Sequence, residues 1–285
     1  MKKVIINADD FGLTEGINKG IIEAHKKGAV TSASLMTNMP SFYDAIRLAK
    51  DNPGLGVGVH LNIVRGEPVL PLGNVRTLVD KEGFFLRNIF KIIAGIYQNK
   101  IDLIELESEW VAQIERALEN GMSVTHLDSE KHLHLIGPAL KILKVLAKRY
   151  KISKIRAINE PMYFNKIFSN PFCIFRKCFY KTLVVNLLSN QMQGLRSTDY
   201  FYGSYEAGNM ILEKYQNLFS CLEDGLTEIM CHPGYIIGEQ ERTLLNYNRY
   251  SLIGKREREL QALINPKFSE LVKQFNISLV SYKDV

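Results

Sequence analysis

The chain has 285 residues, of which 46% are hydrophobic and 23% charged, a globular composition with enough length to bury a substantial core. It contains no run of about 18 apolar residues, so no membrane-spanning helix is predicted. The net charge of +6 is mild, and the basic residues form no recognisable nucleic-acid-binding motif. We therefore expect a cytoplasmic protein with no nucleic-acid partner.

The first part of the chain alternates short apolar strands with amphipathic helices. Strands are predicted at residues 4–8, 30–36 and 55–62, and helices at residues 15–27 and 41–50. Gly28 follows the first helix, as a C-terminal capping residue would. This repeat of strand, loop and helix is typical of a parallel α/β sheet or barrel.

A Gly- and Pro-rich loop at residues 64–85 interrupts the pattern, and loops of that length are usually functional lids or disordered. Further helices are predicted at residues 101–120 and 138–150, and strands at 124–127, 154–158, 228–231 and 277–281. The pattern favours one domain over residues 1–285, an irregular (β/α) barrel of about seven parallel strands with its site at the strand C-terminal ends. An open doubly wound sheet is the second choice, because no glycine-rich dinucleotide motif follows the first strand.

Two strand ends carry side chains suited to catalysis. Asp9 and Asp10 end the first strand, and successive strand residues point to opposite sides, so the two carboxylates are expected to have different tasks. A general base beside a metal ligand is one division, and the alternative is that Asp10 caps the following helix. His60 ends the third strand, either facing the same edge of the sheet or serving as a structural histidine.

A denser group of such residues lies between positions 126 and 134. It holds three of the six histidines and two carboxylates: His126, Asp128, Glu130, His132 and His134. Histidine and carboxylate together suit a divalent ion, and the alternative is a polar loop with a chance cluster. The four cysteines match no zinc motif or disulfide framework, so they are expected to be reduced and any ion to be held by His and carboxylates.

Another histidine, His232, follows the apolar run at residues 229–231, and Pro233 and Gly234 make a tight turn behind it. A histidine at this strand end fits a general acid opposite the metal. Arg156 ends another predicted strand, where it could orient a carboxylate, bind substrate or lie on the surface.

Five ordered motifs resemble the YdjC/ChbG-like carbohydrate deacetylases, covering the chain from residue 4 to about residue 263. They are residues 7–13 (Asn-Ala-Asp-Asp-Phe-Gly-Leu), 28–36 (Gly-Ala-Val-Thr-Ser-Ala-Ser-Leu-Met), 58–61 (Gly-Val-His-Leu), 125–129 (Thr-His-Leu-Asp-Ser) and 232–235 (His-Pro-Gly-Tyr). Residues 256–263 also resemble the family's closing helix. The resemblance implies an irregular (β/α) barrel that removes acetyl groups from N-acetylated sugars such as chitooligosaccharides.

The resemblance also implies one divalent ion held by the second aspartate of the first motif and by two histidines. Asp10 and His60 match two of these ligands, but Glu130 stands where the family usually has a histidine. A glutamate ligand favours harder ions, so Mg is the first expectation, with Zn, Mn, Co or Ni as alternatives. Two alternatives to a Glu130 ligand remain. Either His132 or His126 is the third ligand, or the site no longer binds metal.

In the mechanism we expect, Asp9 is the general base that activates water, and His232, or else His134, protonates the leaving amine. Six residues are expected to bind the carbohydrate substrate or to support the site from behind: His126, Asp128, His132, His134, Arg156 and Tyr235.

A basic insert at about residues 161–197 has aromatic residues at helical spacing. We expect it to pack on the barrel or on a second subunit, which makes a homodimer one option. The alternative is contact with an anionic membrane that carries a lipid-linked sugar. Two functions compete with deacetylation: a metal phosphoesterase, which more often needs two ions, and a sugar-binding or regulatory protein whose metal site has decayed.

Overall fold

The computed structural model describes residues 1–160, 194–238 and 252–285. These residues form a seven-stranded sheet in the order β4-β3-β2-β1-β6-β5, with β7 also paired to β1, and every pairing is parallel. The strands are β1 (Lys2–Phe11), β2 (Ser32–Leu35), β3 (Gly56–Leu61), β4 (Val124–Ser129), β5 (Tyr200–Tyr202), β6 (Gly225–Cys231) and β7 (Ile277–Leu279). The predicted basic insert lies almost wholly outside the described residues.

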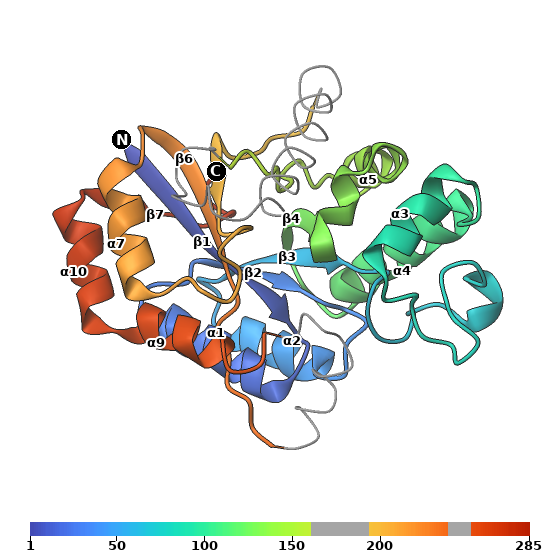
Figure 1. The fold of residues 1–285 in the computed structure, drawn as a ribbon, viewed down its shortest axis with the longest axis horizontal. Coiled ribbons are helices and arrows are strands. Elements are labelled where there is room, and N and C mark those ends of the chain that lie inside the picture. The colour runs from blue at the N-terminus through green and yellow to red at the C-terminus, as the bar shows by residue number, and fades with distance from the viewer. Residues whose placement is uncertain (161–193, 239–251) are drawn as a thin grey trace.

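The long first strand is the axis of the sheet (Figure 1). Along one edge β1 pairs with β6. Its other edge is shared, because residues 2–4 pair with β7 and residues 7–11 pair with β2. The run Val4–Phe11 is buried throughout, which explains its nearly continuous apolar start, since both faces of a parallel sheet are covered.

The sheet curls into a half-barrel, which confirms the predicted irregular (β/α) barrel. Beyond β4, single bridges continue the curl, from Leu127 to Ile155 and from Lys154 to Arg196. The strand predicted at residues 154–158 is reduced to these bridges, because its residues pair singly with two different neighbours and no continuous ladder forms.

Helices surround the sheet (Figure 1). The four predicted ones are present as α1 (Glu15–Lys26), α2 (Phe42–Asp51), α4 (Leu103–Glu119) and α5 (Gly137–Arg149). Thr14 caps α1 by accepting a hydrogen bond from the Ile17 backbone N–H, and Gly28 behind that helix has a φ of +85°, the left-handed conformation that glycine adopts without strain. α1 packs against α2 and against the C-terminal α9.

Several short elements were not predicted: α3 (Ile89–Tyr97), α7 (Leu212–Cys221), α9 (Arg256–Ile264, foreseen only through the family resemblance), α10 (Pro266–Gln274), the 3₁₀ turns η1 (Leu72–Asn74) and η2 (Glu130–Leu135), and β5. Their sequences are too short for periodicity to separate helix from strand.

The loop at residues 64–85 is held against the helix α4, since the backbone N–H groups of Val69 and Leu70 donate to the buried Glu109 of α4 at 2.9 and 3.1 Å.

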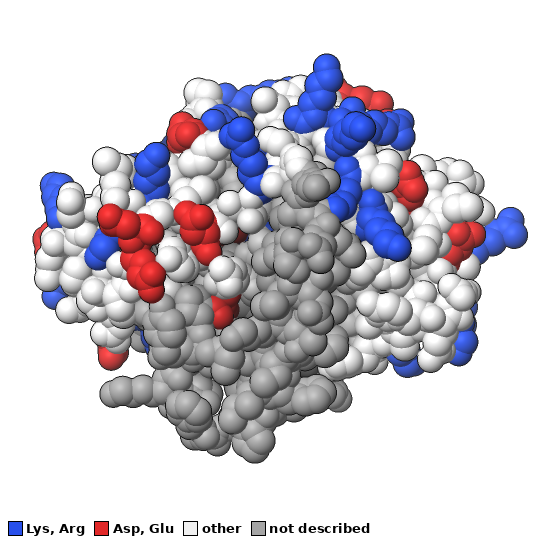
Figure 2. All heavy atoms as spheres, turned by 90° about the horizontal axis from the view of Figure 1, so that it is seen from above, with Lys and Arg blue, Asp and Glu red and all other residues white. Residues whose placement is uncertain are grey.

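The described part of the chain contains no helix of the length and hydrophobicity needed to cross a bilayer. Of the cysteines it includes, Cys231 is buried and Cys221 exposed, and both are free thiols. On the face seen in Figure 2, basic side chains gather along the upper edge, and a group of acidic side chains lies toward the left.

Gly58 of β3 allows the His126 ring of β4 to lie against the backbone. A Cβ added at Gly58 would come within 2.4 Å of the ring, so we expect Gly58→Ala to lower the free energy of unfolding by about 1–3 kcal/mol through overpacking. Urea denaturation measures the change. Gly73→Ala is the matched control, because its added Cβ meets nothing within 4 Å; equal losses in both variants would contradict the prediction.

Candidate active site

The first strand brings two carboxylates to the site. Its register with β2 shifts between Ala8 and Phe11, and Asp10 has a φ of 67°, in the left-handed region that residues other than glycine seldom adopt. Asp9 and Asp10 are both buried. Backbone strain of this kind is concentrated at functional sites, and here it allows adjacent carboxylates to meet different partners.

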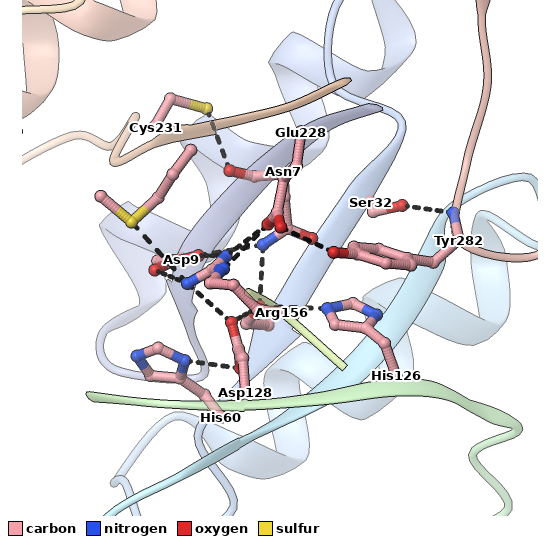
Figure 3. A network of polar contacts seen from close by, with 12 residues as sticks. Asn7, Asp9, Ser32, His60, His126, Asp128, Arg156, Glu228, Cys231 and Tyr282 are labelled. Carbon is pink, nitrogen blue, oxygen red and sulfur yellow. Dashed lines mark hydrogen bonds and ion pairs between the residues drawn. The ribbon is translucent and has the colours of Figure 1, made fainter. Parts of the chain in front are cut away.

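Arg156 is fully buried among carboxylates from three strands (Figure 3). Its Nη1 and Nη2 each donate to one oxygen of Asp9 at 2.7 Å. Nη1 also lies 2.7 Å from Asp128, and Nε donates to Glu228 at 2.9 Å. Burial alone would lower the pKa of Arg156, but the three carboxylates outweigh it and raise that pKa well above its ordinary value. The guanidinium therefore stays charged and fixes Asp9 in one orientation.

His60 is oriented by the same network. Its Nδ1 lies 2.9 Å from Oδ1 of Asp128, which leaves Nε2 for another partner. Burial opposes protonation of His60, but the negative charge of Asp128, with smaller contributions from Asp9 and Asp10, raises its pKa to about 9. A carboxylate behind the imidazole is the usual arrangement for a histidine that ligates a metal.

Two further carboxylates each have an arginine partner. Oε1 of Glu130 accepts hydrogen bonds from both Nε and Nη2 of Arg65, at 3.1 and 2.6 Å. Oδ2 of Asp10 accepts from Nη2 of Arg256. Burial would raise the pKa of Asp10, but the positive charges of Arg256 and Arg65 hold it well below its usual range. Asp10 is therefore ionised, and both carboxylates predicted to bind metal are already paired with an arginine.

The turn after β4 is strained as well. Within η2, Lys131 and His132 have φ values of 53° and 56°, two successive non-glycine residues in the left-handed region. Burial lowers the pKa of both side chains. The strained turn makes Glu130, Lys131 and His132 all line the cavity described below.

Two other histidines of this segment have structural contacts. The Nε2 of His134 lies 3.0 Å from the Arg156 carbonyl oxygen, and the His126 ring stacks on Tyr282 with centroids 3.9 Å apart. Burial lowers the pKa of His134 to about 4 and that of His126 to about 3. Both rings are therefore neutral near pH 7 and support the network around Arg156.

A cavity of about 290 Å³ brings most of the predicted site together. Six predicted residues line it: Asp9, Asp10, His60, Glu130, His132 and His232. Four predicted residues are buried but do not line it: His126, Asp128, His134 and Arg156. Tyr235 lies elsewhere, with its hydroxyl donating to Glu23 of α1 at 2.6 Å.

Apart from Arg156, sequence reasoning did not single out the cations of the site. Arg65, Lys131 and Lys255 line the cavity, and Arg256 is buried against Asp10. Arg65 lies near the start of the loop at residues 64–85, which was expected to be a functional lid or disordered, and Arg256 begins the segment that resembles the family's closing helix. These positions were the only features of the sequence that could have identified the two arginines as site residues, because the neighbouring sequence does not indicate which carboxylate an arginine will contact.

Metal binding is compatible with the donors present. Asp9, His60 and Asp128 are buried and offer ligand atoms within 4.8 Å of one another, so this group could hold a metal ion. The predicted trio of Asp10, His60 and Glu130 is not among the groups with that spacing in the described part of the chain. However, Oε2 of Glu130 is buried and has no hydrogen-bond partner among the described residues. Carboxylate and imidazole donors of this kind suit divalent cations.

The fold and the cavity together define a (β/α)-barrel protein whose acidic and histidine side chains meet at the C-terminal ends of the strands, where the sites of barrel enzymes lie. The family model described as "YdjC-like protein" matches residues 3–274, and the chain belongs to this family.

Proteins that are similar over nearly the whole chain support this family assignment. A protein of Clostridium beijerinckii named carbohydrate deacetylase is 32% identical over 99% of this chain and 100% of its own length. One of Thermoanaerobacter pseudethanolicus with the same name is 31% identical, over 99% of this chain and 98% of its own. The crystal structure of a putative cellobiose-phosphate cleavage protein from Enterococcus faecalis superposes with a TM-score of 0.77 at 30% identity, covering 99% of this chain and 98% of that one. The predicted family and the predicted enzyme class, a carbohydrate deacetylase, are confirmed at the level of these relatives.

Replacing Arg156 should destabilise the fold strongly. Arg156→Met would leave buried carboxylates without their counter-charge, so we expect a loss of about 3–5 kcal/mol in the free energy of unfolding at pH 7. The loss should shrink as the pH is lowered toward 5, because carboxylates whose pKa values have risen then take up protons and no longer repel one another. Denaturant titrations across this pH range measure both effects.

Arg149→Met is the matched control, because Arg149 is a half-exposed arginine paired with the half-exposed Glu115, and such a pair contributes little. A loss below about 1 kcal/mol for Arg156→Met would show that the buried network is not the main constraint.

Proposed function

We propose that the protein hydrolyses the N-acetyl group of an amino sugar or N-acetylated oligosaccharide, such as a chitooligosaccharide, with the help of one divalent metal ion. The observation that carries this proposal is the convergence of two adjacent aspartates, three histidines and a glutamate on one cavity, in a chain whose relatives are named carbohydrate deacetylases.

Asp9 is the proposed general base. Both of its oxygens accept hydrogen bonds from Arg156, which hold the carboxylate in a single orientation while it lines the cavity. In the reaction, water attacks the acetyl carbon and Asp9 takes a proton from that water. The C–N bond then breaks, releasing acetate and the amine.

His232 is the proposed general acid. Its backbone N–H donates to Glu259 at 2.5 Å, which fixes the residue at the end of β6. Burial lowers the pKa of His232 to about 4, opposed in part by Asp9 and Asp10. The ring is therefore neutral before the reaction. His232 first takes up the proton that Asp9 has removed from water, and then gives that proton to the leaving nitrogen.

The proposed metal ligands are Asp10, His60 and Glu130. The closer group of Asp9, His60 and Asp128 is a less suitable metal site, because Asp9 already accepts two hydrogen bonds from Arg156 and Asp128 is already ion-paired with it. An ion there would have to displace a buried guanidinium. His60 keeps Nε2 available behind its bond to Asp128, and Glu130 keeps a buried Oε2.

When bound, the ion would polarise the acetyl carbonyl and lower the pKa of the attacking water. Two carboxylates and one imidazole form a harder donor set than one carboxylate and two histidines, so Mg is the proposed ion, with Zn, Mn, Co and Ni as alternatives. Asp10 and Glu130 would share their charge between the ion and the arginines that hold them.

The first test is acetate release from N-acetylglucosamine oligomers by protein stripped with chelator and then supplied with Mg, Mn, Co, Ni or Zn in turn. We expect release only with an ion present. Asp9→Asn should lower kcat by about 10²–10⁴-fold, because the general base is lost. Asp51→Asn on the exposed side of α2 is the matched control and should leave kcat unchanged.

Three outcomes of that assay, and of the same assay run with sugar phosphates, separate the competing functions. Ion binding without release of acetate would indicate another substrate, such as a lipid-linked sugar. Absence of both binding and release would favour a sugar-binding or regulatory protein. Release of phosphate from sugar phosphates instead of acetate would favour a phosphoesterase. The cytoplasmic location and the homodimer stay predictions.

Glu130→His would recreate the ligand set that the family resemblance implies. We expect the preference to shift from Mg toward Zn or Ni, because imidazole suits those ions better. Calorimetric titration of the stripped protein measures the shift. Glu130→Gln is the companion variant, since it keeps the shape but loses the charge, and its Mg affinity should fall about ten- to hundredfold. Unchanged ion affinity in both variants would exclude Glu130 as a ligand.

A further inference from the structure

The ion pair between Arg65 and Glu130 is one-sided. Nε and Nη2 of Arg65 both donate to the same oxygen, Oε1 of Glu130. Nη1 of Arg65 and Oε2 of Glu130 are both buried and make no hydrogen bond within the described residues. Guanidinium and carboxylate normally pair through two parallel bonds that use both oxygens. This geometry instead leaves one donor and one acceptor uncommitted.

Both uncommitted atoms belong to residues that line the cavity. Arg65 is only 7% exposed and Glu130 only 3% exposed. A buried charged donor without a partner is costly, so such groups are rare unless another molecule completes them. The missing partner of Nη1 is therefore expected to be an acceptor that enters the cavity, and an acyl oxygen is such an acceptor.

Arg65 is also held rigidly in place. Its backbone carbonyl accepts from the Nδ2 atoms of Asn62 and Asn38, at 2.7 and 3.0 Å, and its N–H donates to Oδ1 of Asn62 at 3.1 Å. Asn62 is in turn fixed by Gln113 of α4, which accepts from its backbone N–H at 2.8 Å. A donor that is positioned before the substrate arrives needs no reorganisation during the reaction, which is what effective stabilisation of an oxyanion requires.

We propose that Arg65 is a further catalytic residue, whose Nη1 donates a hydrogen bond to the acetyl oxygen of the substrate. This inference rests on the proposed deacetylase function. When water attacks, the carbonyl double bond opens and negative charge develops on that oxygen, beside the guanidinium. Arg65 forms no covalent bond and remains protonated throughout, and the charge returns to the new carboxylate as the C–N bond breaks.

Arg65→Lys tests the proposal, because lysine keeps the positive charge beside Glu130 but cannot hold Oε1 and reach the acetyl oxygen together. We expect kcat to fall about 10²–10³-fold, as for the loss of one oxyanion donor. KM and the calorimetric dissociation constant of the activating ion should stay within about threefold. Arg65→Gln, which also removes the charge, should lose as much kcat while binding the ion more tightly.

Arg47→Lys is the matched control, since Arg47 is exposed on α2 and paired with Asp44, and its kinetics should be unchanged. A kcat of Arg65→Lys within threefold of the unaltered protein would overturn the proposal. So would a fall in kcat matched by an equal loss of ion affinity, because Arg65 would then only position Glu130. If the unaltered protein releases no acetate from N-acetylglucosamine oligomers with any ion, the proposed function fails for this substrate, and that result is obtained before any variant is compared.

Discussion

The site depends on one buried guanidinium. Asp9, Asp128 and Glu228 come from three strands, β1, β4 and β6, and would repel one another if they were buried alone. Arg156 contacts all three at 2.7–2.9 Å, so the C-terminal ends of these strands meet at a common point. His60 then takes its orientation from Asp128. The orientation of Asp9 and His60 therefore depends on this one buried charge.

A second layer of charge pairs lies nearer the cavity. Asp10 is held by Arg256 and Glu130 by Arg65. Glu130 stands where the family resemblance implies a neutral histidine, and the positive charge of Arg65 lies against its carboxylate, so the pair as a whole carries no net charge. The pair also leaves a single uncommitted carboxylate oxygen, which resembles the single donor atom that an imidazole offers. This compensation is a physical reason why the site can tolerate Glu130 and keep its proposed chemistry.

The predictions succeeded where the signal was local. α1, α2, α4 and α5 lie within two residues of their predicted bounds, because each has an apolar face at helical spacing and a recognisable end. The sites at Asp9, Asp10, His60 and His232 could be located because polar residues at the ends of apolar strands are conspicuous. β5 was missed because a strand of three residues has no readable period, and the strand predicted at residues 154–158 failed because its two edges pair with different partners.

The sequence by itself determined the order of most strands and helices, the barrel class, and a candidate set of carboxylates and histidines, most of which line the cavity. Only the tertiary structure decided how these residues are paired. Arg65 meets Glu130 across 65 positions, and Arg256 meets Asp10 across 246. Periodicity and capping act over a few residues, whereas a charge chooses its partner by proximity in space. Which carboxylate is held, and which donor is left uncommitted, therefore follows from the curl of the sheet.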